Sequence, residues 1–206
     1  MYWFQTFTGK RVDISNPTPE AIDVQDIAHA LSMTCRYGGH CRDFFSVAEH
    51  SLLVEKLGEC RGTTESGLCL LLHDAAEAYI GDIVTPVKRA LDPGDPRPGG
   101  MGEMSIERLE KRWLLAIGEA FGLGSLLAEP SDLVRQSDSR ALAVEVVALF
   151  HPVQSHWWND RERPHCFYES PIHCWSPAEA RRKFLDRFWV LYESLHSKPG
   201  WSEVKP

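Results

Sequence analysis

A histidine and an aspartate stand side by side in the stretch LLHDAAEAYIGD, at His73 and Asp74. Burying ionisable side chains is costly unless they are paired or bind a metal, yet the apolar residues before them predict a helix that packs into the core. His50 and Asp138 lie in two other segments with helical patterns. Imidazole nitrogen and carboxylate oxygen atoms suit a divalent transition ion. We therefore predict that these four residues bind one ion, with manganese, cobalt, zinc and iron all admissible.

Two further carboxylates follow the His-Asp pair. Glu77 comes four residues after His73, which places it one helical turn further along the same face. From there it can hydrogen-bond a water or a leaving group beside the ion without being a ligand. Asp82 follows Gly81 in a turn, where aspartate is common for conformational reasons. We predict Glu77 as a catalytic residue and keep Asp82 as a second candidate, for which a capping role stays open.

Helices must bring these residues together, and helical patterns dominate the chain. The segments WFQTF and KRVDI flank a Thr-Gly turn and predict a short N-terminal hairpin. Ser46 and Glu49 have the spacing of a capping box, in which each side chain binds the other residue's backbone amide. Apolar periodicity and capping residues predict helices over 23–34, 46–58 and 64–79, a short one from Thr85, and longer ones over 105–121, 131–150 and 176–195.

These elements predict an all-α, mostly helical fold with a short N-terminal β-hairpin. A chain of 206 residues is most simply one domain, which we expect to span 1–206 with its functional core over about 23–150. An aromatic segment and the last helix occupy 151–206. The aromatic residues between 157 and 168 suit a lid or an oligomer contact, with ordinary packing as the default interpretation.

Composition limits the classes of function. A net charge of −7 argues against a nucleic-acid partner, because such binding depends on lysine and arginine at phosphates; a small anionic substrate stays possible. The six cysteines are scattered without a C-x-x-C pair, which favours reduced thiols in the cytoplasm. We find no signal-peptide pattern and no apolar run long enough for a membrane span. The expectation is a cytoplasmic protein without a membrane partner.

A second metal site is a weaker hypothesis. Cysteine and histidine side chains suit structural zinc, but the tight spacing of most zinc motifs is absent from the C-terminal part of the chain. We favour coincidence for this set, which comprises His165, Cys166, His173 and Cys174.

The ordered set of one histidine, a His-Asp pair and a later aspartate resembles the signature of the HD-domain phosphohydrolases. FSVAEHS (45–51), LLHDAAEAYIGDIVTPVK (71–88) and the arginine before them resemble in particular the bacterial 5′-deoxynucleotidase branch. Related phage enzymes that hydrolyse dATP to deoxyadenosine and triphosphate are similar in the same segments. The resemblance covers about residues 23–150 and implies a helical HD-domain fold that commonly forms homo-oligomers.

Carried over by position, the resemblance implies that the four ligand residues named above hold the metal. It implies that Glu77 is the catalytic glutamate, that Asp82 is the acidic residue after the glycine, and that Arg36 contacts the substrate phosphate. The next position is usually a tryptophan that contacts the sugar, and here it is Tyr37. This departure leaves the choice between deoxyribose and ribose open.

A divalent ion lowers the pKa of water and polarises a phosphoryl oxygen, so it can support phosphoester hydrolysis without a covalent intermediate. We predict hydrolysis of the 5′ phosphoester of deoxynucleoside monophosphates, with dATP triphosphohydrolase activity as the alternative. A nucleotide-binding regulatory scaffold without catalysis is the alternative of another class. Lys88 and His40 are further candidates for substrate binding, and Arg42 is a weaker one. The sequence contains no P-loop, G-x-G-x-x-G or G-x-S-x-G motif.

Overall fold

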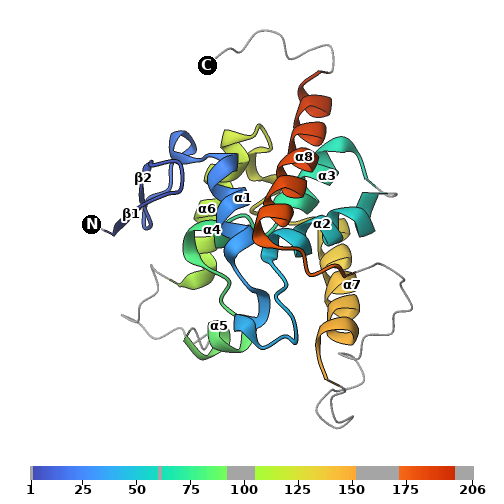
Figure 1. Ribbon diagram of the computed structural model, residues 1–206. Coiled ribbons are helices and arrows are strands. Elements are labelled where there is room, and N and C mark those ends of the chain that lie inside the picture. The colour runs from blue at the N-terminus through green and yellow to red at the C-terminus, as the bar shows by residue number, and fades with distance from the viewer. Residues whose placement is uncertain (1, 60–61, 92–104, 152–171, 198–206) are drawn as a thin grey trace.

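The structure is a computed structural model that describes residues 2–59, 62–91, 105–151 and 172–197 (Figure 1). It confirms a mostly helical fold with an N-terminal hairpin, in which strand β1 (Trp3–Gln5) pairs antiparallel with β2 (Arg11–Asp13). The helices are α1 (Val24–Met33), α2 (Val47–Gly58), α3 (Thr64–Leu72), α4 (Glu77–Ile80), α5 (Thr85–Leu91), α6 (Ile106–Ala120), α7 (Asp132–Leu149) and α8 (Pro177–His196). Among the described residues, no helix is long and apolar enough to cross a membrane.

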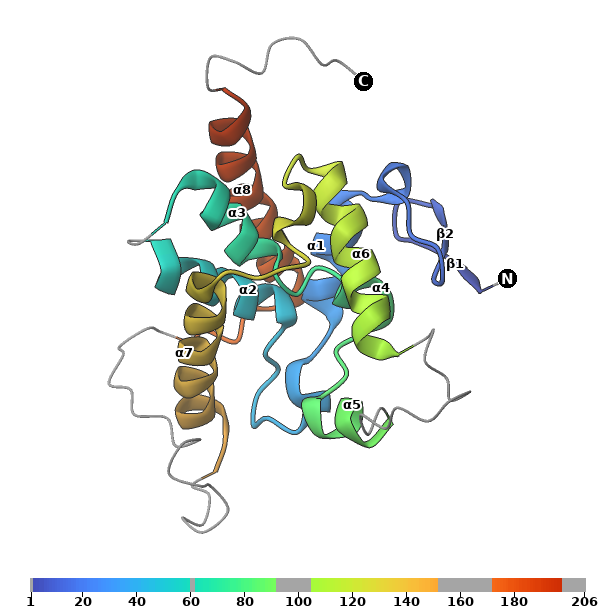
Figure 2. The same cartoon turned by 180° about the vertical axis from the view of Figure 1, so that it is seen from behind.

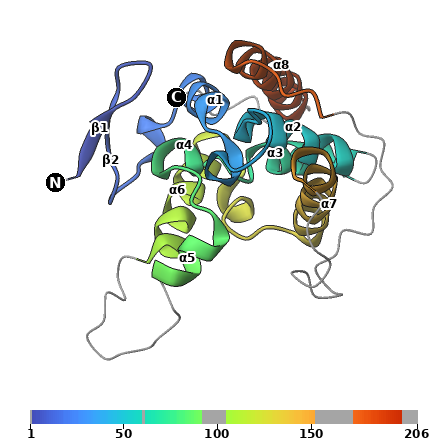
Figure 3. The same ribbon diagram turned by 60° about the horizontal axis from the view of Figure 1, so that its bottom comes forward.

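Helix α2 lies in the middle of the molecule. It contacts α1, α3, α7 and α8, and Figures 1 and 3 show these helices around it. Its core side chains include Val47, Ala48 and Val54, all fully buried. Because α2 is enclosed on several sides, a polar side chain on it can be placed in the interior between helices.

Of the two hydrogen bonds in the predicted capping box at the start of α2, one is present. The Ser46 hydroxyl accepts a hydrogen bond from the Glu49 amide at 3.1 Å, as predicted. The Glu49 carboxylate does not return to Ser46. It accepts the backbone N–H groups of His173, Cys174 and Trp175 at 2.8, 3.0 and 2.8 Å. Three donors satisfy a buried carboxylate better than one, and the contact ties the segment before α8 to α2.

The prediction of one continuous helix over 64–79 is wrong, because α3 ends at Leu72. The following amides bond three residues back: Ala75 N–H donates to the Leu72 carbonyl and Glu77 N–H to the Asp74 carbonyl. This spacing winds the chain more tightly than an α-helix. Helix α4 then begins at Glu77 and ends at Ile80, and Gly81 after it has φ 81°. His73 and Asp74 therefore lie in a tight turn between two helices.

The hairpin is attached to α1 and α6, and Phe7 in its turn also lies against Arg181 of α8. The Thr8 amide and hydroxyl donate to the buried Asp26 carboxylate at 2.6 and 2.8 Å. The Trp113 indole of α6 donates to the Ile14 carbonyl at 3.1 Å. Figure 2 shows the hairpin beside α6, on the opposite side of the molecule from α7. We infer that the hairpin stabilises the fold without contributing to the candidate site.

Candidate active site

Four side chains from three parts of the chain converge on one point. His50 lies on α2, His73 and Asp74 in the turn after α3, and Asp138 on α7. The two histidine Nε2 atoms are 3.2 Å apart. Asp74 Oδ2 lies 3.4 Å from the Nε2 of His50 and 3.2 Å from that of His73. Asp138 Oδ1 lies 3.3 and 3.9 Å from the same two nitrogen atoms.

Apart from the 3.9 Å between Asp138 and His73, these distances fit a divalent ion. An ion with bonds of ~2.1 Å keeps neighbouring ligand atoms roughly 3.0–3.4 Å apart at right or tetrahedral angles. His50, His73 and Asp74 form a group that could hold a metal ion, and Asp138 lies beside it. The donor set of imidazole nitrogen and carboxylate oxygen is the one that transition ions accept. The identity of the metal stays a prediction.

Hydrogen bonds on the other ring nitrogens orient both histidines. His50 Nδ1 lies 2.5 Å from Oε1 of Glu145, and His73 Nδ1 lies 2.9 Å from the Leu70 carbonyl oxygen. Both oxygen atoms can only accept, so each Nδ1 carries the proton. When the ring is neutral, each Nε2 therefore has its lone pair toward the cluster, as metal coordination requires.

The charges in the cluster favour cation binding. Burial alone would raise the pKa of Asp74, but His73 and His50 lower it well below its ordinary value. Burial disfavours the charged form of His50, yet the surrounding carboxylates, Glu145 first among them, raise its pKa well above the ordinary value. A cation among these carboxylates is therefore stabilised, and a metal would compete with the proton on His50 for this place.

Arg36 lies at the edge of the cluster. An isolated β-bridge between Cys35 and Ser46 closes the loop that begins there, and the Arg36 amide donates to the Phe45 carbonyl at 2.9 Å. Its side chain is largely buried. Nε donates to Glu145 Oε2 at 3.2 Å and Nη1 to Asp74 Oδ2 at 3.4 Å. The guanidinium is thus held beside a candidate metal ligand.

Tyr37 has a backbone conformation that is rare for a residue with a side chain. Its φ is 59°, and Gly38 and Gly39 follow with φ of 59° and 79°. The Tyr37 hydroxyl donates to Glu145 Oε2, and its ring meets Phe150 edge to face with centroids 4.8 Å apart. Left-handed backbone at such a residue costs about 1–2 kcal/mol, which these contacts must offset. The ring is therefore held in place beside Arg36.

Glu77 is a buried carboxyl with an unsatisfied oxygen. Its Oε2 has no hydrogen-bond partner among the described residues. Burial, together with the negative charges of Asp74 and Asp82, raises the pKa of Glu77 to about 9. Arg36 and Lys88 are close enough to oppose this rise. A carboxyl with this pKa is protonated at neutral pH and can donate a hydrogen bond.

Asp82 and Lys88 belong to the surroundings of Glu77. Burial raises the pKa of Asp82, while Arg36 and Lys88 oppose the change. The Lys88 ammonium forms an ion pair with Glu110 of α6 at 2.5 Å. Lys88 thus lies near the cluster but is shared with a neighbouring helix.

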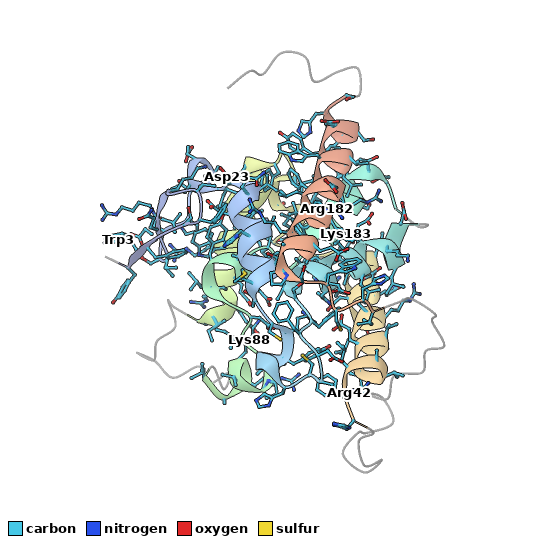
Figure 4. The ribbon with its side chains drawn as sticks, in the orientation of Figure 1. Trp3, Asp23, Arg42, Lys88, Arg182 and Lys183 are labelled. Carbon is cyan, nitrogen blue, oxygen red and sulfur yellow. The ribbon has the colours of Figure 1, made fainter. Side chains whose placement is uncertain are left out.

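The remaining sequence candidates are less involved. His40 is exposed, and no described hydrogen bond links its side chain to the cluster. Arg42 binds the end of α7, where its amide donates to the Leu149 carbonyl and its guanidinium to that of Ala148 (Figure 4). This contact suits a cation at a helix C-terminus. Two of the four residues of the zinc hypothesis, His165 and Cys166, lie outside the described residues.

Glu145 is the site residue that the sequence reasoning missed. It is fully buried on α7 and contacts His50, Arg36 and Tyr37. Its signal was a single glutamate within the apolar run ALAVEVVAL, seven residues after Asp138. That spacing is two helical turns, so both carboxylates lie on the same face of α7.

Two bacterial proteins are similar to this chain over nearly their whole length. The uncharacterized protein RCAP_rcc00048 of Rhodobacter capsulatus is 34% identical over 202 residues, which cover 94% of this chain and 97% of the relative. The uncharacterized protein YfdR of Escherichia coli is 33% identical over 195 residues, with coverage of 94% and 97%. No family model matches the chain.

Proposed function

This chain belongs to the family of the uncharacterized proteins RCAP_rcc00048 and YfdR, and we propose that it is an HD-type, divalent-metal-dependent phosphohydrolase. Its substrates are nucleotides, and its reaction is hydrolysis of the 5′ phosphoester of deoxynucleoside monophosphates. The ordered set of two histidines and two aspartates supports this proposal, because residues far apart in sequence meet with spacings suited to one ion.

The observation that carries the proposal is the position of Arg36. Its Nη1 lies 3.4 Å from Oδ2 of Asp74, so a guanidinium borders the candidate metal ligands. The ion pairs that hold Arg36 use its Nε and Nη1. The planar guanidinium matches two oxygen atoms of a phosphate. A phosphate placed between Arg36 and the cluster could accept hydrogen bonds from the guanidinium and at the same time contact the ion.

When bound, the ion supplies Lewis-acid chemistry: it activates water and withdraws charge from a phosphoryl oxygen. Arg36 binds and orients the phosphate and stabilises the charge that develops on its oxygen atoms. The reaction also requires a proton donor for the departing nucleoside oxygen, which neither the ion nor Arg36 provides.

Glu77 is suited to that task. In the metal-free protein its pKa of about 9 keeps it protonated at neutral pH, and its free Oε2 offers a site from which to donate a proton. We assign Glu77 the role of general acid toward the 5′ oxygen of the leaving nucleoside. Asp82 supports it, because its negative charge raises the pKa of Glu77.

The charge balance around the site supports a monophosphate as substrate. Among the described residues, Arg36 and Lys88 are the cations that affect the pKa of Glu77, and Lys88 is already paired with Glu110. A triphosphate would place more negative charge beside the carboxylates of Asp74 and Asp82. A single phosphate requires less compensation.

The test is a product assay on purified protein with manganese or cobalt, over all deoxynucleoside and ribonucleoside mono- and triphosphates. We expect the wild type to release orthophosphate from the deoxynucleoside monophosphates. The His73→Gln variant should release none. The matched control is His29→Gln, because His29 stacks on Phe7 at the hairpin and should retain activity. Intact triphosphate from dATP would establish the triphosphohydrolase instead. Absence of all products from metal-loaded protein would favour the regulatory scaffold.

A further inference from the structure

The carboxylate of Glu145 contacts three side chains of the candidate site. Its Oε1 accepts from Nδ1 of His50 at 2.5 Å. Its Oε2 accepts from Nε of Arg36 at 3.2 Å and from the Tyr37 hydroxyl. One oxygen atom therefore serves a metal ligand, and the other serves two residues predicted to bind substrate.

We infer that Glu145 is a positioning residue shared by the metal site and the phosphate site. It orients His50 for the ion through one oxygen atom and orients Arg36 and Tyr37 for the nucleotide through the other. The second half of this inference rests on the proposed function, whereas the first half concerns metal binding alone.

The metal half follows from the hydrogen bond to His50. An ionised carboxylate only accepts, so it keeps the proton on Nδ1 and leaves Nε2 free to coordinate. Because His50 and Glu145 are both fully buried, no water can replace this acceptor without a rearrangement of α2 and α7. Acceptors of this kind fix the ring orientation of ligating histidines and increase their basicity.

The substrate half follows from the bonds at Oε2. A bond at Nε fixes the plane of the Arg36 guanidinium, so that Nη1 projects toward Asp74. The Tyr37 hydroxyl bond, together with the edge of Phe150, holds a residue with φ 59°. An unfavourable backbone conformation that side-chain bonds maintain is typical of sites where position matters.

Other buried glutamates show what a purely structural role looks like here. Glu49 also has three donors, but all are backbone amides of the segment before α8. Glu55 is paired with Arg187 of α8 at 2.5 Å, away from the cluster. The three described donors to Glu145 are instead side chains of the candidate site, which a structural anchor would not require.

The test compares Glu145→Gln with Glu55→Gln, two isosteric changes at buried glutamates that each hold an arginine. Binding of zinc to metal-free protein is measured by calorimetry, together with the thermal midpoint. We expect Glu145→Gln to weaken zinc binding about 10–100-fold, and Glu55→Gln to change the midpoint only. Tyr37→Phe, which removes one donor to Oε2, should leave zinc affinity unchanged and raise KM for the nucleotide.

Equal zinc affinity of folded Glu145→Gln and the wild type would overturn the inference. If Glu145→Gln does not fold, a long-range proton–nitrogen NMR spectrum of the zinc-loaded wild type shows which ring nitrogen of His50 carries the proton. His50 must then be protonated at Nδ1, and a proton on Nε2 would refute the assignment. If Glu145→Gln binds zinc more weakly but the wild type hydrolyses no nucleotide, the role of Glu145 in metal binding stands and the proposed function is rejected. The two failures can therefore be distinguished.

Discussion

The Nε2 atoms of His50 and His73 lie 3.2 Å apart, although 23 residues separate them in sequence. Two lone pairs at this distance repel each other unless a proton or a cation lies between them. In metal-free protein the raised pKa of His50 supplies the proton. A metal ion bound there would engage the surrounding donors at once, so its binding would stabilise the fold.

We therefore predict that a divalent transition metal raises the thermal midpoint of protein treated with a chelator. At a hundredfold excess over Kd the gain is about 2.7 kcal/mol, or roughly 5–10 °C for a domain of this size. Differential scanning fluorimetry with manganese, cobalt and zinc measures it. His73→Gln should lose most of the shift, and His29→Gln should keep it. A shift that survives in His73→Gln would place the metal elsewhere.

Replacing Arg36 with lysine should damage phosphate binding more than folding. Lysine keeps the charge but cannot donate to Glu145 and Asp74 while presenting two parallel N–H groups to a phosphate. We expect KM for the monophosphate to rise at least about tenfold, since bonds to charged groups contribute ~1.5–3 kcal/mol. Steady-state kinetics measure this effect. The matched control is Arg187→Lys, which changes an arginine that holds buried Glu55 and should leave KM unchanged.

Local features of the site could be predicted from the sequence, and long-range ones could not. The candidate group of His50, His73 and Asp74 could be predicted because these residue types suit a metal and because local apolar periodicity places them on or beside helices. The end of α3 at Leu72 was not, because apolar periodicity does not distinguish bonds three residues back from bonds four residues back. Glu145 was missed because its partners Arg36 and Tyr37 are 109 and 108 residues away. Only the packing of the loop against α7 reveals them.

A substitution where the hairpin meets α1 should destabilise the fold without changing the candidate site. Asp26 is buried and accepts two hydrogen bonds from Thr8, so Asp26→Ala should lower the free energy of unfolding by ~1–3 kcal/mol. Urea denaturation measures the loss, and a double-mutant cycle with Thr8→Ala isolates the shared part. Zinc affinity should not change. A large loss of metal binding in Asp26→Ala would contradict the structural separation of the hairpin from the site.

Glu77→Gln should stabilise the metal-free protein while abolishing activity. The pKa of Glu77 is raised from 4.5 to about 9 in the folded state, so the folded chain retains a proton that the unfolded chain has lost between these values. Stability of the wild type must then fall as pH rises through this range, by up to about 1.4 kcal/mol per pH unit. Glutamine cannot ionise, so the advantage of Glu77→Gln should grow from pH 5 to pH 8.

Thermal midpoints in chelator across this pH range measure the effect, and kcat with the monophosphate measures the loss of the general acid. The matched control is Glu129→Gln, because Glu129 is exposed and paired with Lys111, and its midpoints should follow those of the wild type at every pH. Glu77→Gln that is less stable than the wild type at pH 8 would show that Glu77 is ionised in the fold. Such a residue could not supply the proton that the leaving nucleoside requires, and the catalytic role would pass to another group.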